Sequence, residues 1–191
     1  MLFSTCIFAF IIAGALGVGD GDFGGCKHVT YDNKFDLRKA SPHIYVYAVP
    51  DLPAFQSVDG ISIATQISSE NDNLILAKAA YHLDSGKIEK LSYTNILASN
   101  GIVEEHFTDE IGNEVTVNMV LLGVVDECRA LVVYRCSKDG TLQTDNVQIL
   151  KIDYKTPMTD ACNAQIDSIV KNSGLDIVKL RVLPYKQTNY S

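Results

Sequence analysis

The sequence lacks the motifs that mark most zinc sites, hydrolases and nucleotide-binding enzymes. It contains no C-x-x-C pair, no Gly-rich phosphate loop after a strand and no nucleophile elbow. Its 16 basic residues are scattered among 23 acidic ones, which gives a formal charge of −7 and no basic patch that could neutralise phosphates. We therefore expect no enzyme activity, no bound metal and no nucleic-acid partner.

Long apolar runs are also scarce, and the one that exists lies at the N-terminus. Residues 1–19 carry no charged side chain, and the apolar stretch from Leu2 to Ala13 is followed by small residues. This stretch is shorter than the roughly 18 apolar residues that a membrane anchor needs. We interpret residues 1–19 as a signal peptide cleaved within 13–19, and residues 20–191 as a single secreted domain without membrane insertion.

Four cysteines remain after residue 19, namely Cys26, Cys128, Cys136 and Cys162. An even number in an oxidising compartment predicts two disulfides. Cys128 and Cys136 bound a run that is typical of one extended strand, which would hold their Cα atoms roughly 26 Å apart, too far for a bond. Two pairings remain open: Cys26–Cys136 with Cys128–Cys162, or Cys26–Cys128 with Cys136–Cys162.

Short β-like runs alternate with tight turns between residues 44 and 153. The runs cover 44–49, 61–67, 74–83, 87–97, 102–111, 114–125, 128–136 and 146–153. Turns at 84–86, 99–101 and 138–140 contain glycine or asparagine, which readily adopt the positive φ of hairpin turns. Strands at this spacing predict an all-β fold, an eight-stranded antiparallel up-and-down barrel that closes and has no free edges.

One helix is predicted after the strands. Thr159 is a suitable N-cap, Gly174 a suitable C-terminal stop, and between them one apolar stripe is formed by Cys162, Ile166, Ile169 and Val170. A single helix after many strands should pack outside the barrel, where a disulfide of Cys162 would hold it against the wall. The alternation in residues 177–183 predicts one further short strand.

Three segments carry motifs of a known family. In "CKHVTYDNKFDLRKASPHIYVYAVP", Phe35 and Asp36 match the opening motif of the lipocalins, although Pro42 and Ile44 replace its glycine and tryptophan. The segment "AYHLDSGKIEKLSYTNILASNGIVEEHF" resembles a strand pair of the insect insecticyanin and bilin-binding lipocalins. The segment "VVDECRALVVYRCS" resembles the strand that ends in Tyr-x-Cys. The match runs in order along nearly all of residues 20–191.

The resemblance implies an eight-stranded antiparallel up-and-down lipocalin barrel with one C-terminal helix packed outside. It implies a secreted carrier of a small hydrophobic ligand, with a bilin-type pigment such as biliverdin as a candidate. It also implies the disulfide Cys26–Cys136, which leaves Cys128–Cys162 as an arrangement of this sequence. Lys151 stands near the arginine that packs on the tryptophan at the base of the barrel, so an Ile44–Lys151 contact should seal the base less rigidly.

Strand parity gives candidate lining residues for the lumen. If Cys128 and Cys136 face outward, the intervening odd-numbered residues face the lumen or its rims. The candidates are Val46, Ala48, Tyr93, Asn95, Val117, Met119, Leu121, Arg129, Leu131, Val133 and Arg135. Mostly apolar side chains with a few polar groups suit an apolar ligand with one polar end, whose carboxylate an arginine could bind.

Other interpretations remain. The same side chains could fill the barrel, which would favour an interaction lipocalin of the salivary type that acts on a protein partner through its loops. The segment Tyr81-His82-Leu83-Asp84 resembles the haem-ligating strand of salivary lipocalins from blood-feeding bugs, which implies His82 as a haem ligand in a haem carrier. Asn189 begins a formal N-glycosylation sequon.

Overall fold

The computed structural model describes residues 18–21, 26–109, 111–137, 146–176, 179–187 and 190. Residues 1–17 of the predicted signal peptide, the predicted turn at 138–140 and the sequon residue Asn189 lie outside the described residues. No helix within the described ranges has both the length and the apolar character needed to cross a membrane.

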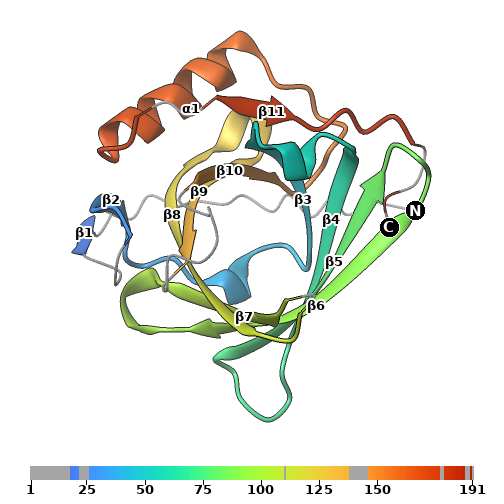
Figure 1. Cartoon of the computed structure of the whole chain (residues 1–191). Coiled ribbons are helices and arrows are strands. Elements are labelled where there is room, and N and C mark those ends of the chain that lie inside the picture. The colour runs from blue at the N-terminus through green and yellow to red at the C-terminus, as the bar shows by residue number, and fades with distance from the viewer. Residues whose placement is uncertain are drawn as a thin grey trace, which may run out of the picture.

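Eight antiparallel strands form a closed barrel (Figure 1). They are β3 (His43–Pro50), β4 (Val58–Ile67), β5 (Leu74–Leu83), β6 (Ile88–Leu97), β7 (Val103–Thr108), β8 (Glu114–Val125), β9 (Ala130–Ser137) and β10 (Asn146–Lys151). Each strand pairs with the next along the chain, and β10 pairs with β3 to close the sheet. The predicted all-β up-and-down barrel is confirmed.

The turns join the strands as their residues predict. Gly86, Asn100 and Gly101 have φ values of 82°, 67° and 74°, the left-handed region that glycine and asparagine tolerate. Short 3-10 helices complete the connections: η1 (Leu37–Lys39), η2 (Pro53–Phe55), η3 (Ser99–Gly101) and η4 (Asp126–Cys128). We call the end with the β4–β5, β6–β7 and β8–β9 turns the base, and the end with the β5–β6 and β7–β8 turns the mouth.

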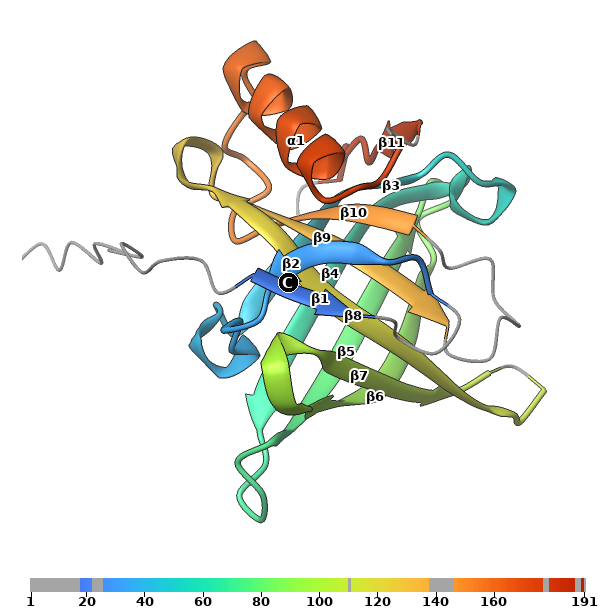
Figure 2. The ribbon, with the colours of Figure 1, turned by 90° about the vertical axis from the view of Figure 1, so that its left-hand side faces the viewer.

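Additional elements pack on the outside of this barrel (Figure 2). The helix α1 (Asp160–Asn172) lies against β8 and β9, and its N-cap Thr159 accepts a hydrogen bond from the Cys162 amide at 3.1 Å. A hairpin of β1 (Val18–Gly21) and β2 (Val29–Asp32) lies across β8, and β11 (Leu180–Val182) pairs with β3. The predicted external helix and the extra short strand are both present.

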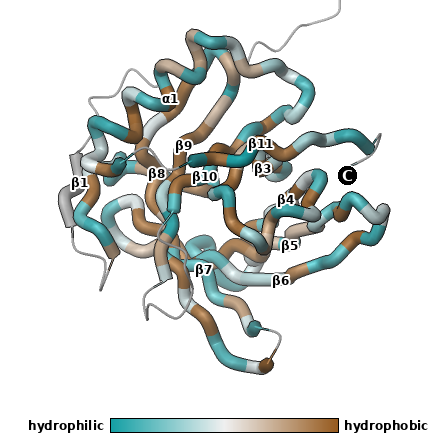
Figure 3. Tube along the Cα trace, turned by 45° about the horizontal axis from the view of Figure 1, so that its top comes forward, coloured by the Kyte–Doolittle hydropathy of each residue, from teal (hydrophilic) through white to brown (hydrophobic). Residues whose placement is uncertain are grey.

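Two hydrophobic clusters lie on opposite sides of the barrel wall, because successive apolar residues of a strand point to opposite faces. Figure 3 shows apolar residues along the strands and along α1. The outer cluster joins the wall to α1 and β2 and includes Val132, Tyr134, Ile149, Ile166 and Val170. The inner cluster lies within the barrel and includes Ile44, Val46, Ile61, Met119, Leu121 and Val133. The predicted outward orientation of Val132 and inward orientation of Val133 are confirmed.

Two disulfides attach the peripheral elements to the wall. Cys26 is bonded to Cys136, with Cα atoms 5.8 Å apart, and Cys128 to Cys162, with Cα atoms 6.3 Å apart. The first bond fixes the N-terminal segment to β9, and the second fixes α1 to the β8–β9 turn. This is the pairing that the family resemblance implied.

The base is not closed by the expected Ile44–Lys151 contact. Ile44 belongs to the inner cluster, but Lys151 pairs in register with Ala130, a member of the outer cluster. Directly paired residues share a face of the sheet, so Lys151 lies on the outside of the barrel. There its ammonium lies 5.0 Å from the centre of the Tyr47 ring and donates to the Thr156 carbonyl, and burial lowers its pKa.

Candidate ligand-binding site

A buried ion pair lies inside the barrel. Arg135 Nε donates to Glu105 Oε2 at 3.0 Å, and Arg135 Nη2 donates to the same oxygen. The Glu105 side chain is 6% exposed and that of Arg135 23%. Burial acts to lower the pKa of Arg135, but the charge of Glu105 outweighs it and raises that pKa. The pair therefore holds both charges within the barrel in a nearly neutral unit.

Two buried amides flank this ion pair. Asn95 on β6 is the register partner of Glu105, and Asn146 on β10 is the register partner of Arg135, so all four side chains share the inner face. Both asparagines are buried, and within the described ranges neither Oδ1 atom accepts a hydrogen bond. Buried polar atoms normally have partners, so these two acceptors suit a hydrogen-bond donor that enters the barrel.

Two tyrosines add to the polar lining. Tyr81 and Tyr93 interact electrostatically with Glu105 and Arg135, and burial raises the pKa of both phenols, so both hydroxyls stay protonated at neutral pH. Both side chains are only half-buried although they point inward. The barrel is therefore less tightly packed at this level than at Val133, which is fully buried. We call Tyr81, Tyr93, Asn95, Glu105, Arg135 and Asn146 the polar band.

Most of the predicted lining residues lie inside. Val46, Met119, Leu121, Leu131 and Val133 belong to or pack against the inner cluster, and Val117 is the register partner of Glu105 on the same face. Tyr93, Asn95 and Arg135 belong to the polar band. Strand parity alone thus placed nine of the eleven candidates on the inner face, and their role in ligand binding stays a prediction.

Two candidates are not in the lumen, and in each case the strand is irregular. Arg129 was expected inside, but β9 begins only at Ala130, and Arg129 is an exposed residue in the left-handed conformation (φ 51°) after η4. Ala48 was expected inside, but a register shift between β10 and β3 places Ala48 in the outer cluster and Val49 in the inner one. Parity requires a regular strand, and a bulge reverses it.

His82 lies on the outer face of the barrel and not in the lumen. Its register partner is Gly60, and a Cβ atom at Gly60 would lie 2.6 Å from the Tyr190 ring, which covers this face. The His82 and Tyr190 rings are 4.8 Å apart in an edge-on arrangement. His82 therefore cannot ligate a haem held inside the barrel, which corrects the role that the segment Tyr81–Asp84 implied.

Acid should weaken the packing of the C-terminal segment on His82. Burial lowers the pKa of His82, although the nearby Asp59 carboxylate partly opposes this. The unfolded chain therefore binds the proton first, so the free energy of unfolding should decrease as the pH falls below about 6.5. Measured between pH 7.5 and 5 by urea unfolding, this decrease should be smaller in His82→Phe. Equal decreases in the two proteins would contradict the assignment.

Protonation of Asp59 should also decrease the free energy of unfolding, but at lower pH. Burial opposes its ionisation, but hydrogen bonds from Tyr190 and from the Lys186 and Gln187 amides lower its pKa overall. Its stabilising effect is therefore lost only as the pH falls through the acid range below about 4. Because Asp59 is present in both proteins, the comparison with His82→Phe isolates the histidine. Lys186 also lies near Asp84, at 3.5 Å, on this side.

Sequence reasoning missed Tyr81, Glu105 and Asn146. Glu105 lies two residues from both Val103 and Phe107 along β7, so the three side chains share one face. The apolar residues on either side should have placed Glu105 inside. Tyr81 likewise shares its face of β5 with Ala77 and Ala79. Asn146 is the first residue of β10, so no preceding strand residues indicate which face of the sheet its side chain occupies.

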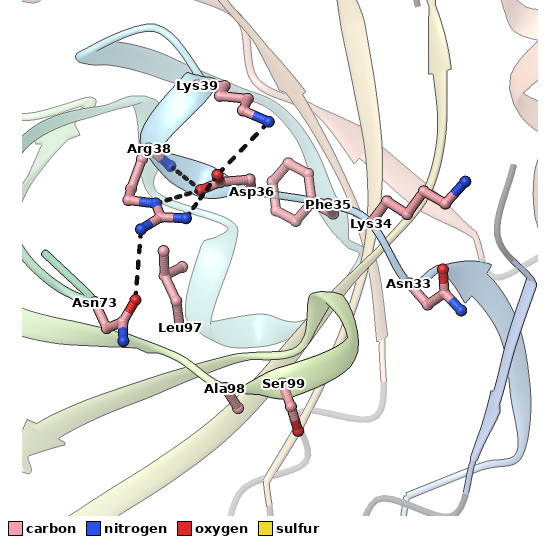
Figure 4. Close-up of a pocket in the computed structure, with 10 residues that line it drawn as sticks. All are labelled: Asn33, Lys34, Phe35, Asp36, Arg38, Lys39, Asn73, Leu97, Ala98 and Ser99. Carbon is pink, nitrogen blue, oxygen red and sulfur yellow. Dashed lines mark hydrogen bonds and ion pairs between the residues drawn. The ribbon is translucent and has the colours of Figure 1, made fainter. Parts of the chain in front are cut away.

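Two hollows lie elsewhere on the described surface. One, of about 500 Å³, lies at the base between the η1 segment and the end of β6 (Figure 4). The other, of about 280 Å³, lies outside the wall between α1, β10 and β3, and is lined by residues such as Ala48, Ile149 and Leu180. Neither hollow is part of the polar band.

Comparison with solved structures identifies proteins of the same architecture. The amine binding protein of Rhodnius prolixus in its tryptamine complex has a TM-score of 0.57 at 14% identity, covering 83% of this chain and 86% of that one. Lobster apocrustacyanin A1 has a TM-score of 0.56 at 12% identity, covering 86% and 89%. The cockroach allergen Per a 4 has a TM-score of 0.55 at 14% identity, covering 78% and 87%.

No protein-family model and no curated protein sequence matches the chain. At such low identities the structural likeness establishes the architecture. The closed eight-stranded antiparallel barrel, with α1 packed outside it, is the architecture that these structures share. The chain therefore has the lipocalin fold.

Proposed function

We propose that this protein is a secreted carrier that holds a small, largely apolar molecule inside its barrel. The observation that carries the proposal is the polar band, in which two buried acceptors without partners flank the Arg135–Glu105 pair. An apolar interior gives affinity for an apolar guest, and a few fixed polar groups orient it. A filled core would gain nothing from buried acceptors without partners.

The chemistry of the polar band defines the guest further. Asn95 and Asn146 offer acceptors, so the guest should carry N–H or O–H donors. The guanidinium of Arg135 has five N–H donors, of which Nε and Nη2 bind Glu105, so it retains donors for a carboxylate. The guest should therefore be apolar over most of its surface and polar at one end.

A bilin such as biliverdin has this chemistry, since its pyrrole rings carry N–H donors and its propionates are carboxylates. Tryptamine, bound by the Rhodnius prolixus protein of the same fold, is likewise an apolar ring system with N–H groups. We propose the bilin class for this chain because the polar band offers both acceptors and an arginine. The two disulfides support secretion, because such bonds persist in oxidising compartments.

A matched pair of substitutions on β5 tests the carrier proposal. Ala79 is buried and pairs with Ile63 on the inner face, whereas Ala80 pairs with Ser62 and Lys90 on the outer face. The wild-type protein should bind one equivalent of an apolar fluorescent probe. Ala79→Phe should weaken this binding at least about ten-fold because the ring occupies the lumen, while Ala80→Phe should bind as the wild type does. Fluorescence titration measures both.

The alternative is a filled barrel that acts on a protein partner through its loops. In that case the wild-type protein would bind no probe, and Ala79→Phe would instead lower the free energy of unfolding by about 1–3 kcal/mol through overpacking. Displacement of the probe by biliverdin would support the bilin class. Probe binding without displacement would leave the carrier proposal intact and exclude the pigment.

A further inference from the structure

The hollow at the base has an apolar floor (Figure 4). Phe35 and Leu97 line it, and both are half-buried and pack against the inner cluster. Ala98 extends this apolar surface along the start of the β6–β7 turn. Lys151 lies on the outer face of the barrel at the end of β10 and so does not fill the interior at the base. The floor of the hollow is therefore continuous with the hydrophobic interior.

The rim of the same hollow is cationic. Arg38 binds Asp36 through Nε at 2.8 Å and Nη2 at 2.9 Å, and Lys39 Nζ lies 3.8 Å from the same carboxylate. These hydrogen bonds from Arg38 lower the pKa of Asp36, so its charge is present at neutral pH and is neutralised by Arg38. Three of the ten lining residues are cationic and one is acidic, and the nearby Asp72 carboxylate also interacts electrostatically with Arg38. The cations therefore outnumber the acidic groups at this rim.

Lys39 is bound to Asp36 less closely than Arg38 is. Its side chain is 79% exposed, and its contact with Asp36 is longer than a hydrogen bond. Arg38 is fixed by Asp36 and by Asn73, whose Oδ1 lies 3.5 Å from Nη1. The hollow thus places a guanidinium held by two partners and an exposed ammonium beside an apolar floor.

We propose that this hollow is a second ligand site, which binds an amphipathic anion of the long-chain carboxylate class. The carboxylate lies at Lys39 and Arg38, and the first part of the alkyl chain lies on Phe35 and Leu97. The site is at the base, at the opposite end from the mouth, so it is distinct from the polar band. Its occupancy does not depend on whether the lumen carries a guest.

The proposal is tested with a fluorescent long-chain fatty acid and its methyl ester, using the full-length secreted protein. Ala98→Trp should fill the hollow and weaken binding of the acid at the base at least ten-fold. Lys39→Gln should weaken it about three- to five-fold, as expected for loss of one exposed charge pair. Lys87→Gln is the matched control, because Lys87 is an exposed lysine paired with Glu89 near the mouth, and it should bind as the wild type does.

Ala79→Phe separates the two sites, since it should leave the base site intact whether or not the lumen binds. The methyl ester should bind at the base at least three-fold more weakly than the acid, and the acid should bind more weakly at high salt. Unchanged binding of the acid by both Ala98→Trp and Lys39→Gln, with normal thermal unfolding, would overturn the proposal. So would binding to anionic phospholipid vesicles that depends on Lys39 and is not displaced by the fatty acid.

Discussion

Replacing Cys26 and Cys136 together by alanine is expected to lower the free energy of unfolding by about 4–5 kcal/mol. The bond closes a separation of 110 residues, and the chain entropy that a cross-link removes from the unfolded state grows with the logarithm of that length. Denaturant unfolding of the oxidised proteins measures the difference. The loss should exceed most effects of single side chains in this fold, which typically cost 0.5–3 kcal/mol.

The second disulfide gives the comparison. Cys128–Cys162 closes only 34 residues, so the same reasoning predicts a loss of about 3–4 kcal/mol for the corresponding double alanine variant. This variant should also release α1 from the β8–β9 turn, so that amides of α1 exchange faster than those of β9. A larger loss from Cys128–Cys162 than from Cys26–Cys136 would contradict an entropic origin of the difference.

Replacing Arg135 by methionine is expected to lower the free energy of unfolding by about 3 kcal/mol at pH 7. The substitution keeps much of the side-chain volume but leaves the Glu105 carboxylate buried in the barrel without its partner. Breaking a buried pair by removing one member costs about 3–5 kcal/mol, and the low end applies because Arg135 retains some exposure. Urea unfolding at pH 7 measures the loss.

The double variant Arg135→Met/Glu105→Met is the control. It removes both charges at once, so its stability should return to within about 1 kcal/mol of the wild type or exceed it. Under the proposed function this variant should bind the apolar probe but lose selectivity for a guest with a polar end. Equal instability of the single and double variants would show that the ion pair does not account for the loss.

Local sequence signals accounted for most of the barrel. The hairpin turns at Gly86 and Asn100-Gly101 and the N-cap at Thr159 depend on the conformations and hydrogen bonds of a few neighbouring residues. Parity along β9 placed Val132 and Val133 on opposite faces, because β9 pairs with β10 without a register shift. Such features could be predicted because each depends on residues adjacent in the chain.

Long-range contacts decided the features that were mispredicted. Ala48 turned outward because β3 and β10, which are about 100 residues apart in sequence, meet with a register shift. Lys151 lies over Tyr47 and not over Ile44, because it shares the outer face of β10 with Val147 and Ile149. His82 was buried by Tyr190, a residue near the C-terminus, which no pattern around His82 indicates.

The sequence by itself determined that the chain is an antiparallel barrel with an external helix, because strand alternation, turn chemistry and helix capping are properties of short segments. Its cysteines alone left two pairings open, and only the family resemblance favoured the observed one. The tertiary structure decided the composition of the candidate site. Glu105, Arg135, Asn95 and Asn146 come from four strands, and closure of the barrel brings their side chains together on one face. A site assembled from separate strands depends on register, and register is set by the packing of the whole sheet.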